Sequence, residues 1–467
     1  MALVVMAEGK AKYVFYFIGD GMGVNQVNGT ETYMAAVEGR IGTSPLCFAQ
    51  FPYVGLVTTY SGTNGVTDSA AGGTALATGN KTKNGALGIK SDLTTRINSI
   101  AALAKSEGKA VGVTTSVSVD HATPASFYAH VKDRNMYHQI GKDLIAAGFD
   151  FYAGSDFLIS AQFIDFLQPE NNELSGNKDL YTQCREAGYT IARGYADYRK
   201  KAKKADKMLL LQTETANKAD RTSIPYAIDR QKNDLTLQDI TRAAIHFLSQ
   251  KDTDGFFLMV EGGKIDWACH SNDAATAFKE VIDMDNAIKV AYEFYEQHPD
   301  ETLIIITADH ETGGIVLGTG KYELRTDLLK YQKQSAGAFS KMIAAQHQKE
   351  GKKFTWDFVR KQLQDNFGFW SQIPLDERET EQLKKAYENF CEGVAKDTKT
   401  LYESENIIAS TARQLMARKA MVGWQSGGHS NGYVPVFAIG AGAEEFTGRI
   451  DNTEIPKKIA EIAGYKE

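Results

Sequence analysis

The sequence is poor in several features that would place it in a specialised class of protein. Its 467 residues include only 9 prolines against 42 glycines, which excludes a proline-rich low-complexity chain and suits a fold with many tight turns. No stretch reaches the roughly 20 consecutive apolar residues of a membrane-spanning helix. The net charge of −6 is small, so composition favours neither nucleic acid nor an anionic membrane as a partner.

Cysteine is also scarce, and its positions exclude one class of metal site. The four cysteines are scattered and form no C-x-x-C pair, so a zinc-finger framework has no support. Two disulfides remain possible. Cys269 adjoins His270, but we interpret it as a small buried residue. The four are Cys47, Cys184, Cys269 and Cys391.

The first eight residues lack the length and the basic start of a secretory signal. They resemble instead the end of the apolar segment of such a signal, followed by small residues at a cleavage site. We interpret them as the remnant of a truncated export signal. The alternative is an ordinary N-terminal segment.

Up to about residue 320 the chain alternates short apolar runs with longer helical patterns. Residues 95–107 and 273–296 have helical patterns, and residues 109–119 read as a strand. This alternation is typical of an α/β fold with a mostly parallel sheet and helices on both faces. The 43% hydrophobic content is enough for a large core.

The pattern changes between residues 321 and 420. Gln, Lys and Glu dominate there, strand patterns disappear, and helical periodicity prevails. Strand character returns at residues 429–440. Because His429 lies beyond the helical stretch, we expect a single domain over residues 1–467 with a helical insertion at 321–420, rather than two domains.

Residues that bind metals accompany five of the apolar runs. Asp309 and His310 follow the run Leu303–Thr307 directly, and Asp20 follows Tyr13–Ile18. In open α/β sheets the carboxyl ends of the strands form the active site. Five such coincidences predict a site for several metals. The other three runs bring Glu261, Asp266 and His270 after residues 256–260, His121 and Thr123 after residues 111–119, and His429 before residues 434–439.

The glycine-rich turn Gly19–Gly23 has a competing interpretation as a dinucleotide-binding turn. Its third glycine comes one residue too early for G-x-G-x-x-G, and Asp20 inside the turn would repel a pyrophosphate. An aspartate held by glycines at a strand end suits a metal better, so we favour metal binding here.

Thr67–Ala75 reads as the start of a helix rich in small residues. Asp68 is placed as its N-cap, which leaves Ser69 at the positive end of the helix dipole. A serine there can act as a nucleophile toward a phosphoryl group, or it can merely help to cap the helix. Because the sequence places no histidine nearby as a base, activation would have to come from a metal.

Asp266 and His270 are four residues apart, which places both on one helix face at a spacing suited to zinc. The candidate ligands would supply two zinc ions with about three protein ligands each and leave an oxygen-rich site for magnesium. Paired metals of this kind serve phosphoryl transfer. The candidates are Asp20, Glu261, Asp266, His270, Asp309, His310 and His429.

At this point the sequence resembles the alkaline phosphatases. The resemblance is carried by Thr67–Ala71, by Val260–Gly262 with Asp266 and His270, by Thr307–Gly314 and by Gly428–Ser430. It implies a three-layer α/β/α sandwich with a large, mostly parallel central sheet. It also implies hydrolysis of small phosphomonoesters of broad range through a phosphoserine.

The resemblance further implies a role for each site residue. Ser69 would be the nucleophile, and Arg134 would grip the phosphate with Asp68 orienting it. One zinc ion would be held by Asp266, His270 and His429, and a second by Asp20, Asp309 and His310 beside Ser69. Magnesium would be held by Asp20, Thr123 and Glu261. Because members of this family are commonly exported dimers, the resemblance also implies a homodimer and export to the periplasm or the medium.

Two positions near the site differ from the best-known enterobacterial member of that family. His121 stands where an aspartate is found near magnesium, and Trp267 where a lysine is found near the phosphate. Both are candidate substrate-binding residues, and together they predict weaker retention of phosphate. The alternatives are a phosphodiesterase or phosphomutase of the same superfamily, or a non-catalytic metal-dependent phosphate-binding protein. Arg134 argues against the diesterase, and an intact Ser69 against the binding protein.

Overall fold

The computed structural model describes residues 11–158, 179–251 and 253–466. The expected remnant of an export signal lies outside these ranges. Among the described residues, no helix is both long and apolar enough to cross a membrane.

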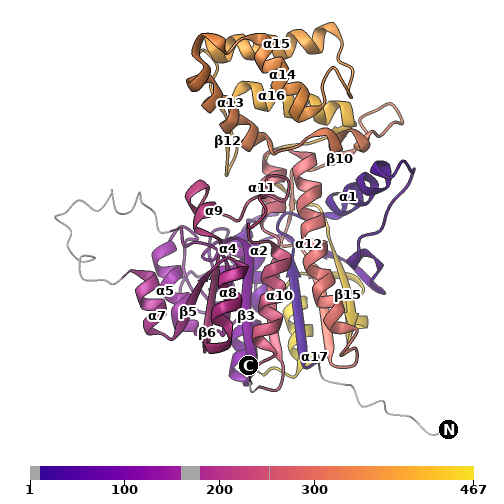
Figure 1. Cartoon of the computed structure of the whole chain (residues 1–467). Coiled ribbons are helices and arrows are strands. Elements are labelled where there is room, and N and C mark those ends of the chain that lie inside the picture. Colours follow the sequence, from indigo (N-terminus) through magenta and orange to yellow (C-terminus); the bar gives the residue numbers. More distant parts are fainter. Residues whose placement is uncertain (1–10, 159–178, 252, 467) are drawn as a thin grey trace.

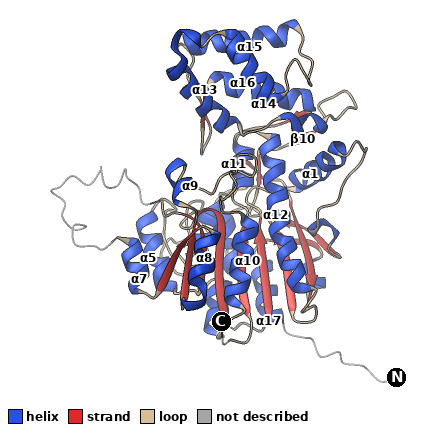
Figure 2. Cartoon of the chain, in the orientation of Figure 1, coloured by secondary structure: helices blue, strands red, loops and turns tan. Residues whose placement is uncertain are grey.

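A ten-stranded sheet forms the centre of the molecule, with helices on both faces (Figures 1 and 2). Its strand order is β16-β2-β15-β8-β1-β7-β3-β4-β6-β5, and only β15 runs antiparallel to its neighbours. This confirms the expected α/β fold with a mostly parallel sheet. The strands are β1 (Tyr13–Ile18), β2 (Tyr53–Thr58), β3 (Ala110–Ser118), β4 (Phe151–Ser155), β5 (Tyr189–Arg193), β6 (Lys207–Leu211), β7 (Phe256–Glu261), β8 (Thr302–Thr307), β15 (Val434–Gly440) and β16 (Gly448–Asp451).

The central strands are buried on both faces, which explains their unbroken apolar sequences. Every residue of β7 and β8 is buried, as is all of β1 after its first residue. Branched and aromatic side chains suit this position because they fill the space between sheet and helices. The helices that cover the sheet form two groups. In one, α10 (Leu237–Leu248) packs against α8 (Tyr195–Lys201) and α12 (Ala274–Tyr295). In the other, α2 (Ser69–Thr78), α3 (Ile100–Ser106) and α17 (Glu454–Ala463) pack against one another.

Helix α3 is shorter than its sequence pattern indicates. The pattern predicts a helix from residue 95, but α3 begins at Ile100, where Ser99 caps it by accepting a hydrogen bond from the Ala102 amide. Arg96 instead forms a β-bridge with Ile89. The serine cap therefore sets the start of the helix, since its side chain satisfies an amide that the first turn leaves free.

The helical segment that precedes the last strands forms a body of its own above the carboxyl ends of the sheet (Figure 1). A second hydrophobic cluster holds it together and also joins it to α1 (Val24–Val37) and α12, through Tyr33, Ala274 and Phe278. It contains two short strands that the helical pattern does not predict, β11 (Thr398–Lys399) and β12 (Ser404–Glu405), which pair as a hairpin. Its main helices are α13 (Ala336–Glu350), α14 (Trp356–Phe367), α15 (Glu377–Cys391) and α16 (Ile407–Ala420).

Candidate functional site

The parallel register of the sheet gathers the predicted ligands at one edge. Ile18 of β1 lies opposite Glu261 of β7 and Thr307 of β8. Residues that follow these positions therefore meet at the carboxyl ends of three adjacent strands, where open α/β sheets place their sites. Asp20, Glu261, Asp309 and His310 are all fully buried there.

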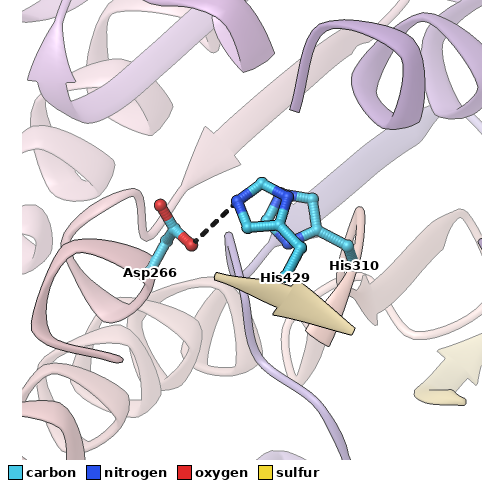
Figure 3. Close-up of side chains that lie close together, drawn as sticks. All are labelled: Asp266, His310 and His429. Atoms are coloured by element: carbon cyan, nitrogen blue, oxygen red, sulfur yellow. Dashed lines mark ion pairs between the residues drawn. The ribbon is translucent and has the colours of Figure 1, made fainter. Parts of the chain in front are cut away.

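A first group of side chains comes from a helix, a strand end and a small two-stranded sheet (Figure 3). Asp266 and His270 lie on α11 (Lys264–His270), with 3.2 Å between His270 Nε2 and Asp266 Oδ2. His429 belongs to the two-residue strand β14 (His429–Ser430), which pairs with β9 (Glu311–Thr312) and so comes beside His310. His429 Nε2 lies 3.6 Å from Asp266 Oδ1 and 3.2 Å from His270 Nε2. Asp266, His310 and His429 offer ligand atoms that lie within 4.8 Å of one another.

A second group contains Asp20, Asp309 and His310, whose ligand atoms also lie within 4.8 Å of one another. His310 Nε2 is 3.2 Å from Asp20 Oδ1 and 3.4 Å from Asp309 Oδ2. The ring of His310 stacks on that of His429, with centroids 3.6 Å apart, so the first two groups are adjacent. Adjacent ligand groups are what a pair of cooperating metal ions requires.

A third group contains Asp20, Glu261 and His121, whose ligand atoms also lie within 4.8 Å of one another. Thr123 is buried nearby, and its hydroxyl lies 3.4 Å from Asp309 Oδ2. The sequence places His121 with the substrate, whereas the structure also places it among possible metal ligands.

The donor set fits metal ions because several of its atoms lack any other partner. Both carboxylate oxygens of Asp20 and Oε1 of Glu261 are buried without a hydrogen-bond partner in the described parts of the chain. Burial raises the pKa of Asp20 and Asp309 well above the ordinary value, and the surrounding carboxylates raise both pKa values further. Burial also raises the pKa of Glu261 to about 7. Buried carboxylates at such density need cations to compensate them.

Ser69 is the first residue of α2, and Asp68 is its N-cap as predicted. The Oδ1 atom of Asp68 accepts a hydrogen bond of 3.0 Å from the Ala71 amide. Ser69 Oγ faces the second group and lies 3.2 Å from His310 Nε2. The serine therefore lies at the positive end of a helix dipole and next to a candidate metal ligand, which suits a nucleophile.

The small residues of α2 let the helix approach the strand end closely. A Cβ atom on Gly72 would lie 2.9 Å from the Asp309 carbonyl oxygen. Gly21 has φ of 73°, and a Cβ atom there would lie 2.9 Å from Asp266 Cα. Glycine at these two positions is therefore needed to bring Ser69, Asp309 and Asp266 together.

Arg134 reaches the site from a loop and has two contacts there. Its Nη1 lies 3.3 Å from Asp68 Oδ2, and its Nη2 lies 3.3 Å from His121 Nε2. Burial, together with the Arg134 charge, lowers the pKa of His121 to about 3, so the imidazole is neutral at pH 7. A guanidinium held at two of its nitrogens has a defined orientation toward an anion.

One residue of the site went unnoticed in the sequence. Tyr402, from the turn of the β11–β12 hairpin, stacks on Trp267 with ring centroids 4.2 Å apart and an interplanar angle of 12°. Its hydroxyl lies 3.5 Å from His121 Nε2. No strand end, helical spacing or glycine turn marks Tyr402, so only the fold reveals it.

The four cysteines are free thiols, which answers the question of disulfides that the sequence leaves open. Cys269 is buried, as expected, and its sulfur lies 3.9 Å from Gln26 Nε2. It is therefore a packing residue beside the site rather than one of the grouped ligands.

Comparisons with known proteins agree with this geometry. The family model described as alkaline phosphatase matches residues 11–465. Alkaline phosphatase 3 of Bacillus subtilis is 32% identical over 463 residues, which cover 98% of this chain and 90% of that protein. The crystal structure of a cold-active alkaline phosphatase from Shewanella sp. is 28% identical, with a TM-score of 0.78 over 97% of this chain and 99% of that one. A third structure is that of a histidine-to-aspartate variant of an Antarctic bacterial alkaline phosphatase, with Mg bound in its M3 site. It is 26% identical, with a TM-score of 0.66, and the match covers 98% of this chain and 99% of that one.

Proposed function

The chain belongs to the alkaline phosphatase family and is a metal-dependent phosphomonoesterase, and we propose that it works through a phosphoserine formed on Ser69. The observation that carries this proposal is the position of Ser69 Oγ, at a helix N-terminus and 3.2 Å from His310 Nε2. In the first half-reaction the deprotonated Oγ forms a bond to phosphorus while the bond to the ester oxygen breaks. In the second, water forms the new bond and Ser69 leaves, which releases inorganic phosphate.

Arg134 binds the phosphoryl group in this proposal. Its two terminal nitrogens are held by Asp68 and His121, so the guanidinium is oriented before the substrate arrives. Such preorganisation reduces the entropy lost on binding. A monoester has free phosphate oxygens that the two terminal nitrogens of the guanidinium can contact, whereas a diester carries a second ester group in place of one of them.

The metal complement is a proposal of the same kind. Zinc ions would be held by Asp266, His270 and His429 and by Asp20, Asp309 and His310, and magnesium by Asp20, Thr123 and Glu261. The support is the unpartnered oxygens of Asp20 and Glu261 and the Mg bound in the M3 site of a similar enzyme. When bound, the ions supply positive charge that acidifies a hydroxyl and stabilises the attacking and leaving oxygens. Elemental analysis of the purified protein, after dialysis against both metals, tests this complement.

The experiment that tests the phosphoserine is trapping. Protein loaded with zinc and magnesium is incubated with ³²P-labelled para-nitrophenyl phosphate, quenched with acid and digested for peptide mapping. We expect label on the peptide that contains Ser69, none in Ser69→Ala, and wild-type labelling in Ser106→Ala, a serine on the exposed side of α3. Label on another residue, or turnover that persists in Ser69→Ala, would contradict the proposal. Parallel assays with the bis-ester are expected to show little hydrolysis.

Two wider expectations also remain proposals. We propose a homodimer, which the resemblance implies and which the exposed apolar side chains Val54, Leu56 and Tyr433 at one end of the sheet support. Light scattering of the purified protein tests it, with Leu56→Glu as the variant expected to weaken association. Export from the cytoplasm is implied by the resemblance, and fractionation of the source cells would test it.

A further inference from the structure

The β11–β12 hairpin carries one side chain out of the helical insertion and into the site. Its strands pair Thr398 with Glu405 and Lys399 with Ser404, and the Thr400 amide closes the turn by donating to the Glu403 carbonyl at 2.8 Å. Figure 1 shows β12 on the side of the insertion that faces α11. Tyr402, in this turn, packs against the core around the sheet rather than against the hydrophobic cluster of the insertion.

Tyr402 contacts three side chains of the site. Its ring stacks on Trp267 at 4.2 Å and meets the edge of His270 at 5.5 Å. Its hydroxyl is 3.5 Å from the His121 nitrogen that lies 3.3 Å from Arg134 Nη2. A tyrosine that only filled space would not need its polar end directed at the residue that holds Arg134.

The hairpin is held in place on both sides of Tyr402. Glu405 is fully buried and pairs with Arg413 of α16, with Oε2 3.0 Å from both Nε and Nη2. Before Tyr402, Thr400 Oγ1 accepts a hydrogen bond of 3.4 Å from Ser271 Oγ, and Ser271 directly follows α11, the helix that carries Asp266 and His270. The position of Tyr402 is therefore tied both to the insertion and to the helix of the metal ligands.

We propose that Tyr402 is a positioning residue for phosphate binding, which it supports by fixing the imidazole of His121 and, through it, the guanidinium of Arg134. The proposal rests on the proposed role of Arg134 as the phosphate-binding residue. The proposal gives the helical insertion a function in the reaction, because the insertion supplies the side chain that holds His121 and Arg134 in place. The stack on Trp267 holds the tyrosine ring, and the hydroxyl then limits the rotation of the histidine.

The first test compares Tyr402→Phe with wild type in protein loaded with zinc and magnesium. Removal of one hydroxyl leaves the stack on Trp267 intact, so the fold is expected to survive. We expect the inhibition constant of inorganic phosphate and the KM for para-nitrophenyl phosphate to rise about three- to ten-fold, as for the loss of one hydrogen bond, with a smaller change in kcat. The matched control is Tyr387→Phe, which removes a hydroxyl bonded to Phe354 O at 3.0 Å within the insertion. Equal inhibition constants in wild type and Tyr402→Phe would overturn the proposal.

The second test is a double-mutant cycle with Arg134→Ala. If Tyr402 acts through Arg134, Tyr402→Phe changes the inhibition constant of phosphate little when Arg134 is already absent. Fully additive effects would overturn the proposal, because Tyr402 would then act independently of Arg134. If Arg134→Ala alone leaves phosphate inhibition unchanged, the proposed role of Arg134 fails instead, and the two failures are distinguishable. Tyr402→Leu adds a spectroscopic check, since loss of the stack is expected to shift the tryptophan fluorescence spectrum.

Discussion

The Oδ2 atom of Asp68 lies 3.3 Å from Nη1 of Arg134, while the other oxygen of the same carboxylate caps helix α2. One side chain thus joins the helix that presents Ser69 to the guanidinium that faces the phosphate site. Oδ2 also accepts a hydrogen bond from the Gly85 amide at 3.0 Å, which fixes the rotation of the carboxylate. The relative position of nucleophile and cation therefore depends on Asp68.

Two substitutions of Asp68 separate its two roles. Asp68→Asn keeps an N-cap side chain, so we expect stability to change by less than about 0.5 kcal/mol. It removes the charge that holds Arg134, and we expect kcat/KM to fall on the order of ten-fold. Asp68→Ala loses the cap as well and should cost about a further 1 kcal/mol of unfolding free energy. Urea unfolding and steady-state kinetics measure the two effects, and wild-type kcat/KM in Asp68→Asn would refute a role in orienting Arg134.

Trp267 provides a test of phosphate retention. Trp267 is buried against Tyr402 and His121 and contributes no cation to the site. Trp267→Lys would add a positive charge beside the phosphate, so we expect phosphate inhibition to become several-fold tighter. Trp267→Phe, which keeps an aromatic ring for the stack, should leave the inhibition constant close to that of wild type. A Trp267→Lys variant with unchanged or weaker phosphate inhibition would show that this position does not set phosphate affinity.

Removal of the metals is expected to lower both activity and stability. Asp20, Glu261, Asp266 and Asp309 are fully buried within one cluster, and their charges repel one another when no cation is present. Chelation with EDTA should therefore abolish turnover and lower the thermal unfolding midpoint by several degrees. Addition of zinc and magnesium should restore both. Calorimetry and activity assays follow the cycle, and an unchanged midpoint after verified metal removal would mean that these carboxylates do not depend on bound cations.

The ligands at strand ends could be predicted from sequence because one geometric rule governs them. Once Tyr13–Ile18, Phe256–Val260 and Leu303–Thr307 are recognised as parallel strands, their carboxyl ends must meet. Asp20, Glu261, Asp309 and His310 then fall at one edge of the sheet without any knowledge of side-chain conformation. Asp266 and His270 follow a second local rule, the spacing of four residues on a helix.

Arg134 and Tyr402 obey no such rule. Both reach the site from irregular turns, where the direction of a side chain depends on contacts made by distant segments. Arg134 could be identified only through the resemblance to a known family. Tyr402 lies in the insertion, to which the family motifs do not extend, and its partners Trp267 and His121 come from other parts of the chain. The length of helix α3 escaped prediction for a similar local reason, since several residues before Ile100 could have capped it.

Glu405 makes the stability of the hairpin depend on pH. Burial raises the pKa of Glu405 to about 7, although Arg413 opposes the rise. Because the folded protein binds the Glu405 proton more tightly than the unfolded chain does, protonation of Glu405 stabilises the fold. This stabilisation is fully present below the ordinary pKa of a glutamate, near 4.5. It is lost as the pH rises through about 7. The free energy of unfolding should therefore fall between about pH 5 and pH 8, by at most about 3 kcal/mol from this group.

Substitution of Glu405 isolates that contribution. Glu405→Gln cannot ionise, so we expect the urea unfolding midpoint to vary less between pH 5 and pH 8 than in wild type. Because glutamine resembles the protonated carboxyl that Glu405 carries below pH 7, the variant should be about as stable as wild type near pH 5 and should lose less stability toward pH 8. Glu381→Gln, on the exposed side of α15, is the matched control and should keep the wild-type pH profile. A wild-type profile in Glu405→Gln would show that other groups set the pH dependence, and that the link between Glu405 and Arg413 does not govern the stability of the hairpin.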